Sequence, residues 1–95
     1  LGDVYKRQAL SGKIGAAVAV GGDRSGGQEI AIRTIIDFFI INEMIPVGGG
    51  AFGANLGASI WSKDKREEGA REDREGLKSL YKTVTRLINV ASGDV

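Results

Sequence analysis

The 95-residue sequence contains no cysteine and no histidine. For this stretch of chain, these absences exclude a thiolate nucleophile, an imidazole acid or base, a Cys/His zinc site and a cysteine-ligated iron–sulfur cluster. We therefore expect no metal site. Any chemistry must come from a bound cofactor, carboxylates, hydroxyl groups or backbone amides.

The sequence has neither an excess of charge of one sign nor a long apolar stretch. Thirteen Lys and Arg face twelve Asp and Glu, for a net charge of +1, which is no electrostatic footprint for nucleic acid or an anionic membrane. No apolar run approaches the roughly 18 residues of a membrane span, and the first residues lack the apolar stretch of a signal peptide. We expect a cytoplasmic protein with no nucleic-acid or membrane partner.

Glycine is in excess, with 15 residues of 95, about twice its ordinary usage. Loops with special backbone geometry are therefore the expected place for function. The length allows one hydrophobic core. Residues 1–8, LGDVYKRQ, show no apolar periodicity and look like translated adapter sequence, so we expect a non-native leader followed by part of a single domain at 9–95.

The apolar pattern predicts alternating strands and helices. Residues 14–20 are apolar or glycine without alternation, which is typical of a buried parallel strand. Residues 28–44 lack Gly and Pro and repeat polar positions every four residues, which predicts a helix. Residues 45–47 predict a short strand at a sheet edge, because Pro46 cannot donate a ladder hydrogen bond. Residues 51–61 give no clear pattern.

The last part of the chain predicts a solvated segment followed by a helix. Residues 62–75 are mostly charged with mixed signs, which favours a loop and a first helical turn. An apolar stripe at helical spacing then predicts a helix that ends at Ser92 and Gly93. Its members are Leu77, Leu80, Tyr81, Val84, Leu87, Ile88 and Ala91.

The order strand, helix, strand, helix implies a parallel pair with a right-handed crossover. Two strands are too few for an independent sheet. The sequence therefore predicts the C-terminal part of a larger α/β domain, whose apolar faces need neighbours that this chain hardly supplies.

Two glycine-rich loops, 21–27 and 48–53, are expected at the carboxyl ends of the two strands, where ligands bind in open α/β sheets. Loop 21–27 runs into the helix, so its amides form a nest for an anion or an electron-rich ring edge; the alternative is that its glycines serve a tight turn. It is no Walker loop, because Gly27 and Gln28 stand where the lysine and hydroxyl residue belong.

Loop 48–53 contains G-x-G-x-x-G but does not open into a helix, which argues against a dinucleotide fingerprint and favours a flexible loop near a ligand. Phe52 and Trp61 could pack on a ring system or be buried in a core or interface.

Residues 12–49 resemble the flavodoxin-fold NAD(P)H-dependent FMN oxidoreductases. The likeness is closest to the iron–sulfur flavoproteins and more distant to the quinone reductases first described as Trp-repressor-binding proteins. It rests on a strand that ends in glycine, the turn R-S-G-G-Q-E at 24–29 and M-I-P-V-G at 44–48. The resemblance implies a flavodoxin-like, doubly wound parallel sheet of five strands in the order 2-1-3-4-5, of which this chain would supply strands four and five with their helices.

The resemblance also implies an enzyme that holds FMN, takes electrons from NAD(P)H and reduces a quinone, another small acceptor or a protein partner. Loop 21–27 would line the isoalloxazine ring, with Arg24 or Ser25 at its polar edge, Gln28 holding the loop shape, and loop 48–53 as a second wall. A family-like homo-oligomer is expected, and no catalytic side chain is assigned. The alternative is a flavodoxin-like electron carrier or interaction module without nicotinamide turnover. The implied cofactor contacts are Gly21, Gly22, Asp23, Arg24, Ser25, Gly26, Gly27, Gly49, Gly50 and Phe52.

Overall fold

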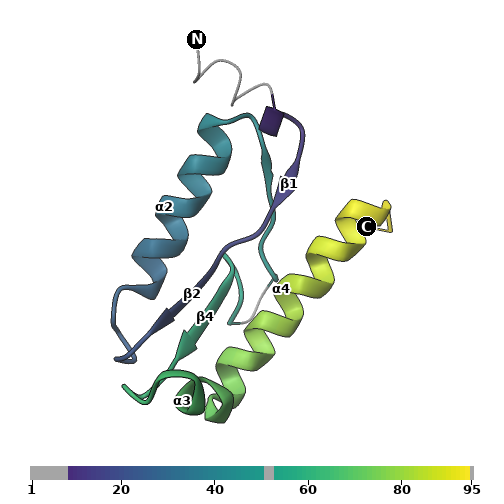
Figure 1. The fold of residues 1–95 in the computed structure, drawn as a ribbon. Helices are drawn as coiled ribbons and strands as arrows, with labels where there is room; N and C mark the ends of the chain where they lie inside the picture. Colours follow the sequence, from purple (N-terminus) through teal and green to yellow (C-terminus); the bar gives the residue numbers. More distant parts are fainter. Residues whose placement is uncertain (1–8, 51–52, 95) are drawn as a thin grey trace.

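A computed structural model describes residues 9–50 and 53–94. The expected leader at 1–8 and the aromatic candidate Phe52 lie outside the described residues. Within them, short parallel strands have a helix on each side (Figure 1). The α/β class predicted from the sequence is confirmed, and the arrangement is that of part of a flavodoxin-like domain.

In the described part of the chain, four short strands form two parallel pairs that follow one another along one direction (Figure 1). β1 pairs with β3, and β2 pairs with β4, so that Gly21 lies opposite Trp61. The strand predicted at 14–20 is confirmed as β1 and β2, which are separated by two alanines. The strands are β1 (Ile14–Gly15), β2 (Val18–Gly21), β3 (Ile45–Pro46) and β4 (Ala58–Trp61).

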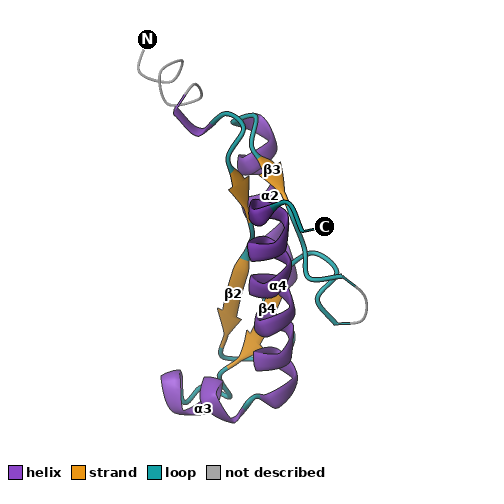
Figure 2. Cartoon of the chain, turned by 90° about the vertical axis from the view of Figure 1, so that its right-hand side faces the viewer, coloured by secondary structure: helices purple, strands orange, loops and turns teal. Residues whose placement is uncertain are grey.

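The second line of strands is interrupted by a long insertion, residues 47–57, between β3 and β4. Loop 48–53 follows the carboxyl end of β3, as predicted, but the same line of strands continues through β4 to Trp61. Figure 2 shows the described parts of this insertion projecting sideways between β3 and β4. Its base is closed by the Gly49 N–H, which donates to the Ala54 carbonyl at 2.7 Å.

Helix α2 (Gln28–Ile41) connects the two lines of strands and covers one face of the sheet (Figure 1). The sequence predicts this helix over 28–44, and the structure ends it three residues earlier. Glu43 adopts a left-handed φ of 61°, which ends the helical path. The Asn42 side chain donates to the Phe38 carbonyl at 2.9 Å and satisfies part of the helix end.

Helices α3 (Arg66–Glu72) and α4 (Arg74–Ser92) follow β4. The prediction of a loop at 62–75 is corrected, because it contains the whole of α3. The predicted end of the last helix is confirmed, with Gly93 at a φ of 78°. Among the described residues, no helix combines the length and apolarity needed to cross a membrane.

The face that α4 turns to the sheet is not its apolar stripe. The buried residues of α4 are Gly76, Ser79 and Thr83, which are small enough to let the helix approach β4 closely. Five members of the predicted stripe are exposed, four of them with large side chains, and so are two valines of β2. The described residues thus leave an apolar surface on this side of the sheet. The sequence predicts such a surface, because its apolar faces need neighbours that this chain hardly supplies. The members of this surface are Val18, Val20, Leu77, Tyr81, Val84 and Ile88.

Side chains from α4 satisfy the outer backbone edge of β4. The Ser79 hydroxyl accepts from the Ser59 N–H at 3.2 Å. The Asp73 carboxylate accepts from the Trp61 N–H at 2.7 Å through Oδ2, and from the Gly76 N–H at 3.0 Å through Oδ1. Asp73 is therefore both the N-cap of α4 and a partner of the edge strand.

We expect Asp73→Ala to lower the free energy of unfolding by about 2–3 kcal/mol, because a helix cap is lost and a part-buried strand N–H loses its acceptor. Urea denaturation of the full-length protein measures this. Glu75→Ala, an exposed acid in the same helical turn, is the matched control and should cost less than about 1 kcal/mol. Equal losses for the two variants would contradict the double role of Asp73.

Candidate functional site

Loop 21–27 lies at the carboxyl end of β2 and leads directly into α2 (Figure 1). Gly27 occupies the position before the helix with a left-handed φ of 89°, and no side chain caps the helix there. A glycine is required at this φ, because other residues adopt it only with strain. The loop and the first turn of the helix therefore present backbone amides at the sheet end, as the sequence predicts.

Gln28 holds this loop against β4. Its side-chain Nε2 donates to the Asp23 carbonyl at 2.8 Å and to the Ile60 carbonyl at 3.3 Å, and the residue is 5% exposed. The place where a Cβ on Gly21 would stand lies 2.6 Å from the Gln28 amide, so only glycine leaves room for this side chain. The role of Gln28 in holding the loop shape is confirmed by these contacts.

Asp23 shapes the turn from within. Its Oδ1 accepts from the Arg24 N–H at 2.7 Å, which is a local side-chain turn. A Cβ on Gly26 would stand 3.0 Å from the Asp23 carbonyl oxygen, the same oxygen that accepts from Gln28. Asp23 thus takes part in the loop through its own backbone and side chain.

Trp61, the last residue of β4, lies between loop 21–27 and the turn that follows the strand. The Arg24 guanidinium carbon is 4.6 Å from the centroid of the indole ring, and the Lys63 Nζ is 5.3 Å from it. Both distances are within the range of cation–π attraction. The sequence marks Trp61 as a candidate to pack on a ring system, and here its contacts are two cations.

The turn at 62–66 braces loop 21–27 from the other side. The N–H and the hydroxyl of Ser62 both donate to the Gly21 carbonyl, at 2.8 Å and 3.2 Å. Three residues of the turn have left-handed φ angles of 55–59°, which costs roughly 1 kcal/mol or more for each. They are Lys63, Asp64 and Arg66. Such strain persists only where surrounding contacts enforce it.

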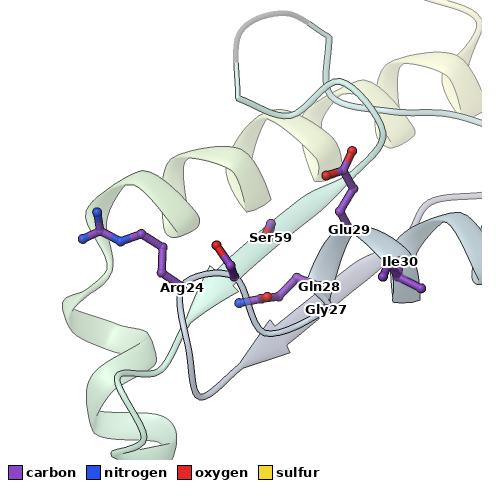
Figure 3. A pocket seen from close by; sticks show the side chains of 7 residues that line it. Arg24, Gly27, Gln28, Glu29, Ile30 and Ser59 are labelled. Atoms are coloured by element: carbon purple, nitrogen blue, oxygen red, sulfur yellow. The ribbon is translucent and has the colours of Figure 1, made fainter.

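Two pockets adjoin the loop. A pocket of about 300 Å³ is lined by loop and helix residues including Arg24, Ser25 and Glu29, with Ser59 from β4 at its floor (Figure 3). A second pocket of about 560 Å³ extends from Arg24 past Trp61 to the start of α4. These sizes lie within the range of small-ligand sites.

Loop 48–53 takes a different position from the one expected. Gly49 packs against Thr83 of α4, where a Cβ would stand 2.8 Å from the Thr83 hydroxyl oxygen. Gly50 forms a bridge with Ala54. The loop reaches the larger pocket beside Arg24 through Gly53. Flavin contacts by Gly49, Gly50 and Phe52 stay predictions.

A family model for the NADPH-dependent FMN reductases matches residues 1–59. The chain belongs to this family. The part of the chain that matches the NADPH-dependent FMN reductase family includes loop 21–27 and Gln28, but it ends before Trp61 and the turn at 62–66.

Curated relatives extend the likeness over most of the chain. An iron–sulfur flavoprotein of Methanocaldococcus jannaschii is 66% identical over 83 residues, which are 87% of this chain and 42% of the relative. One from Archaeoglobus fulgidus is 61% identical over 76 residues, which are 80% of this chain and 38% of the relative. One from Methanosarcina thermophila is 38% identical over 85 residues, covering 90% and 40%.

The chain thus spans about two-fifths of the length of these relatives. No solved structure matches it significantly.

Sequence reasoning missed three parts of the site in this FMN reductase family member: strand β4 that ends in Trp61, the bracing turn at 62–66, and Asp73. A usable signal was present in A-S-I-W at 58–61, which alternates small or polar with larger residues. For Asp73, the signal was an acid three residues before Gly76 at the start of a helix.

Proposed function

We propose that the chain supplies the ring-edge loop of an FMN-dependent oxidoreductase that takes electrons from NAD(P)H and reduces a quinone or another small acceptor. We propose further that it forms the C-terminal part of the flavodoxin-like domain of that enzyme. The observation that carries the proposal is loop 21–27, held at the sheet end by Gln28 and opening into a helix, in a member of the FMN reductase family.

The residues of the loop fit an isoalloxazine edge, which has carbonyl oxygens and ring nitrogens that accept or donate hydrogen bonds. Ser25 makes no hydrogen bond to another described residue, so its hydroxyl and N–H are available to a ligand. The side of Gly27 is open, because nothing lies within 4 Å of where a Cβ would stand. The glycine backbone therefore lets a flat ring approach closely.

When bound, FMN supplies the hydride and electron chemistry. The residues of this chain position the ring edge: Ser25 and the loop amides provide hydrogen-bond donors, and Gln28 keeps them in place. We assign no proton-transfer role to any side chain here.

The relatives named as iron–sulfur flavoproteins suggest a second redox group in the whole protein. These 95 residues contain no cysteine and therefore offer no thiolate ligand. We propose that any cluster is held by other parts of the protein and that electrons then pass between the cluster and the flavin.

We also propose a homo-oligomer. The exposed Ile30, Phe38 and Ile41 of α2 support it.

Anaerobic stopped-flow absorption of the full-length protein with bound FMN tests the proposed activity. We expect the oxidised-flavin bands to bleach on addition of NADH or NADPH and to return when a quinone is added. Bands that stay unchanged with both nucleotides would favour the flavodoxin-like electron carrier. Failure of the purified protein to take up FMN would contradict both functions.

A further inference from the structure

The indole of Trp61 joins the middle of loop 21–27 to the edge strand. Arg24 belongs to the loop, and its guanidinium carbon lies 4.6 Å from the ring centroid. The register of β2 and β4 sets Trp61 opposite Gly21, so the ring stands beside the loop where it leaves the sheet. The Arg24 side chain is thereby directed toward β4.

We propose that Arg24 is a positioning residue that acts through Trp61 and does not itself touch the flavin. This inference rests on the proposed function, because it assigns roles within the same flavin loop. It changes the role that the family resemblance implies for Arg24, and it leaves Ser25 and the loop amides as the groups that meet the polar edge of the ring.

The rest of the loop has few other restraints. Gln28 fixes the carbonyl of Asp23, and Asp23 accepts the Arg24 N–H. Beyond that point Ser25 makes no hydrogen bond within the described chain, and the two glycines that follow have no side chain. The attraction between the Arg24 guanidinium and the indole is therefore the side-chain contact that orients this segment.

The indole is a suitable anchor because the backbone of Trp61 and of the next residue is fixed. The Trp61 N–H donates to Asp73 Oδ2 at 2.7 Å, and the next residue, Ser62, donates twice to the Gly21 carbonyl. A cation held on a fixed aromatic ring keeps the loop in one conformation before the flavin arrives. Such pre-organisation reduces the ordering cost of binding.

A double-mutant cycle in the full-length protein tests this role. The variants are Arg24→Gln, Trp61→Leu and the two combined, and the FMN dissociation constant is measured by flavin fluorescence. Both changes break the contact between Arg24 and the indole, and Trp61→Leu also removes the contact with Lys63. We therefore expect Arg24→Gln to weaken FMN binding about fivefold in the wild type and to add no further loss to Trp61→Leu. Trp61→Phe, which keeps a weaker ring, should recover part of the affinity.

Arg33→Gln is the matched control, since it removes an exposed arginine from α2 and should change FMN affinity by less than about twofold. If Trp61→Leu does not fold, the same cycle is run with Trp61→Phe.

If Arg24→Gln weakens binding as much in the Trp61 variant as in the wild type, Arg24 meets the flavin directly and the inference fails. Unchanged affinity in every variant overturns it as well. A wild-type protein that binds no FMN refutes the proposed function instead, so the two failures are distinguishable.

Discussion

Gln28→Glu lowers the free energy of unfolding of the full-length protein by about 3 kcal/mol at pH 8, and FMN affinity falls with it. The buried amide nitrogen that donates to the Asp23 and Ile60 carbonyls is replaced by a carboxylate oxygen that faces the same two oxygens. A buried carboxylate that has no donor and faces two acceptors destabilises the fold by this amount. The substitution also releases the loop from β4.

The loss depends on pH in a direction that the geometry sets. Burial and the facing carbonyls raise the folded-state pKa of the introduced carboxyl above its unfolded value. The protonated form can donate one hydrogen bond, so the deficit is smallest at acidic pH and grows as pH rises through the raised pKa. Chemical denaturation at pH 5 and pH 8 measures the difference.

Gln28→Leu is the control, because it also removes the donor but carries no titratable group. Its deficit relative to wild type should be the same at both pH values. Equal pH dependence of the two variants, or wild-type stability of Gln28→Glu at pH 8, would show that Gln28 does not hold the loop.

Gly69→Ala destabilises the full-length protein by at least about 3 kcal/mol, although alanine is the better helix former by about 1 kcal/mol. Gly69 is buried in α3, and a Cβ there would overlap the backbone carbonyl of Ser62. A backbone atom cannot rotate away as a side chain can. The helix must then move off the turn at 62–66 that braces the Gly21 carbonyl.

Thermal or urea unfolding measures this effect, and Glu68→Ala, an exposed residue of the same helix, is the control with an expected change of under about 0.5 kcal/mol. A stabilised Gly69→Ala variant would mean that α3 does not pack on Ser62. FMN affinity should fall in Gly69→Ala and stay unchanged in the control.

The first half of the fold could be predicted because its signals are local. The apolar run at 14–20 and the Gly-free, Pro-free run after Gly27 correspond to β1, β2 and α2. Loop 21–27 could be placed at the sheet end from the order of these elements. The contacts of Gln28 follow from the same geometry, since a side chain at the start of the helix faces the neighbouring strand.

The second half depends on distant contacts. β4 is preceded by a glycine-rich insertion and becomes a strand through pairing with β2, about 40 residues earlier. Periodicity in α4 picks out its apolar stripe, but the helix docks through Gly76, Ser79 and Thr83. The small residues let α4 approach β4, and side-chain oxygens of Ser79 and Asp73 accept hydrogen bonds from N–H groups at the edge of β4. A hydropathy pattern does not predict these contacts.

The strained turn at 62–66 illustrates the same limit. Its sequence, S-K-D-K-R, reads as solvated charge. The left-handed angles of Lys63 and Asp64 arise because Ser62 is held on Gly21 and α3 packs directly against the Ser62 carbonyl. Only the assembled strands and helix create that restraint.

The proposed function requires that loop 21–27 meets the flavin. Backbone amide chemical shifts of the isotope-labelled full-length protein, recorded before and after addition of FMN, test it most directly. We expect the largest changes within this chain at residues 22–28, with Ser25 among them, and small changes at the far end of α2. Large shifts elsewhere in the chain with an unperturbed loop 21–27 would contradict the account.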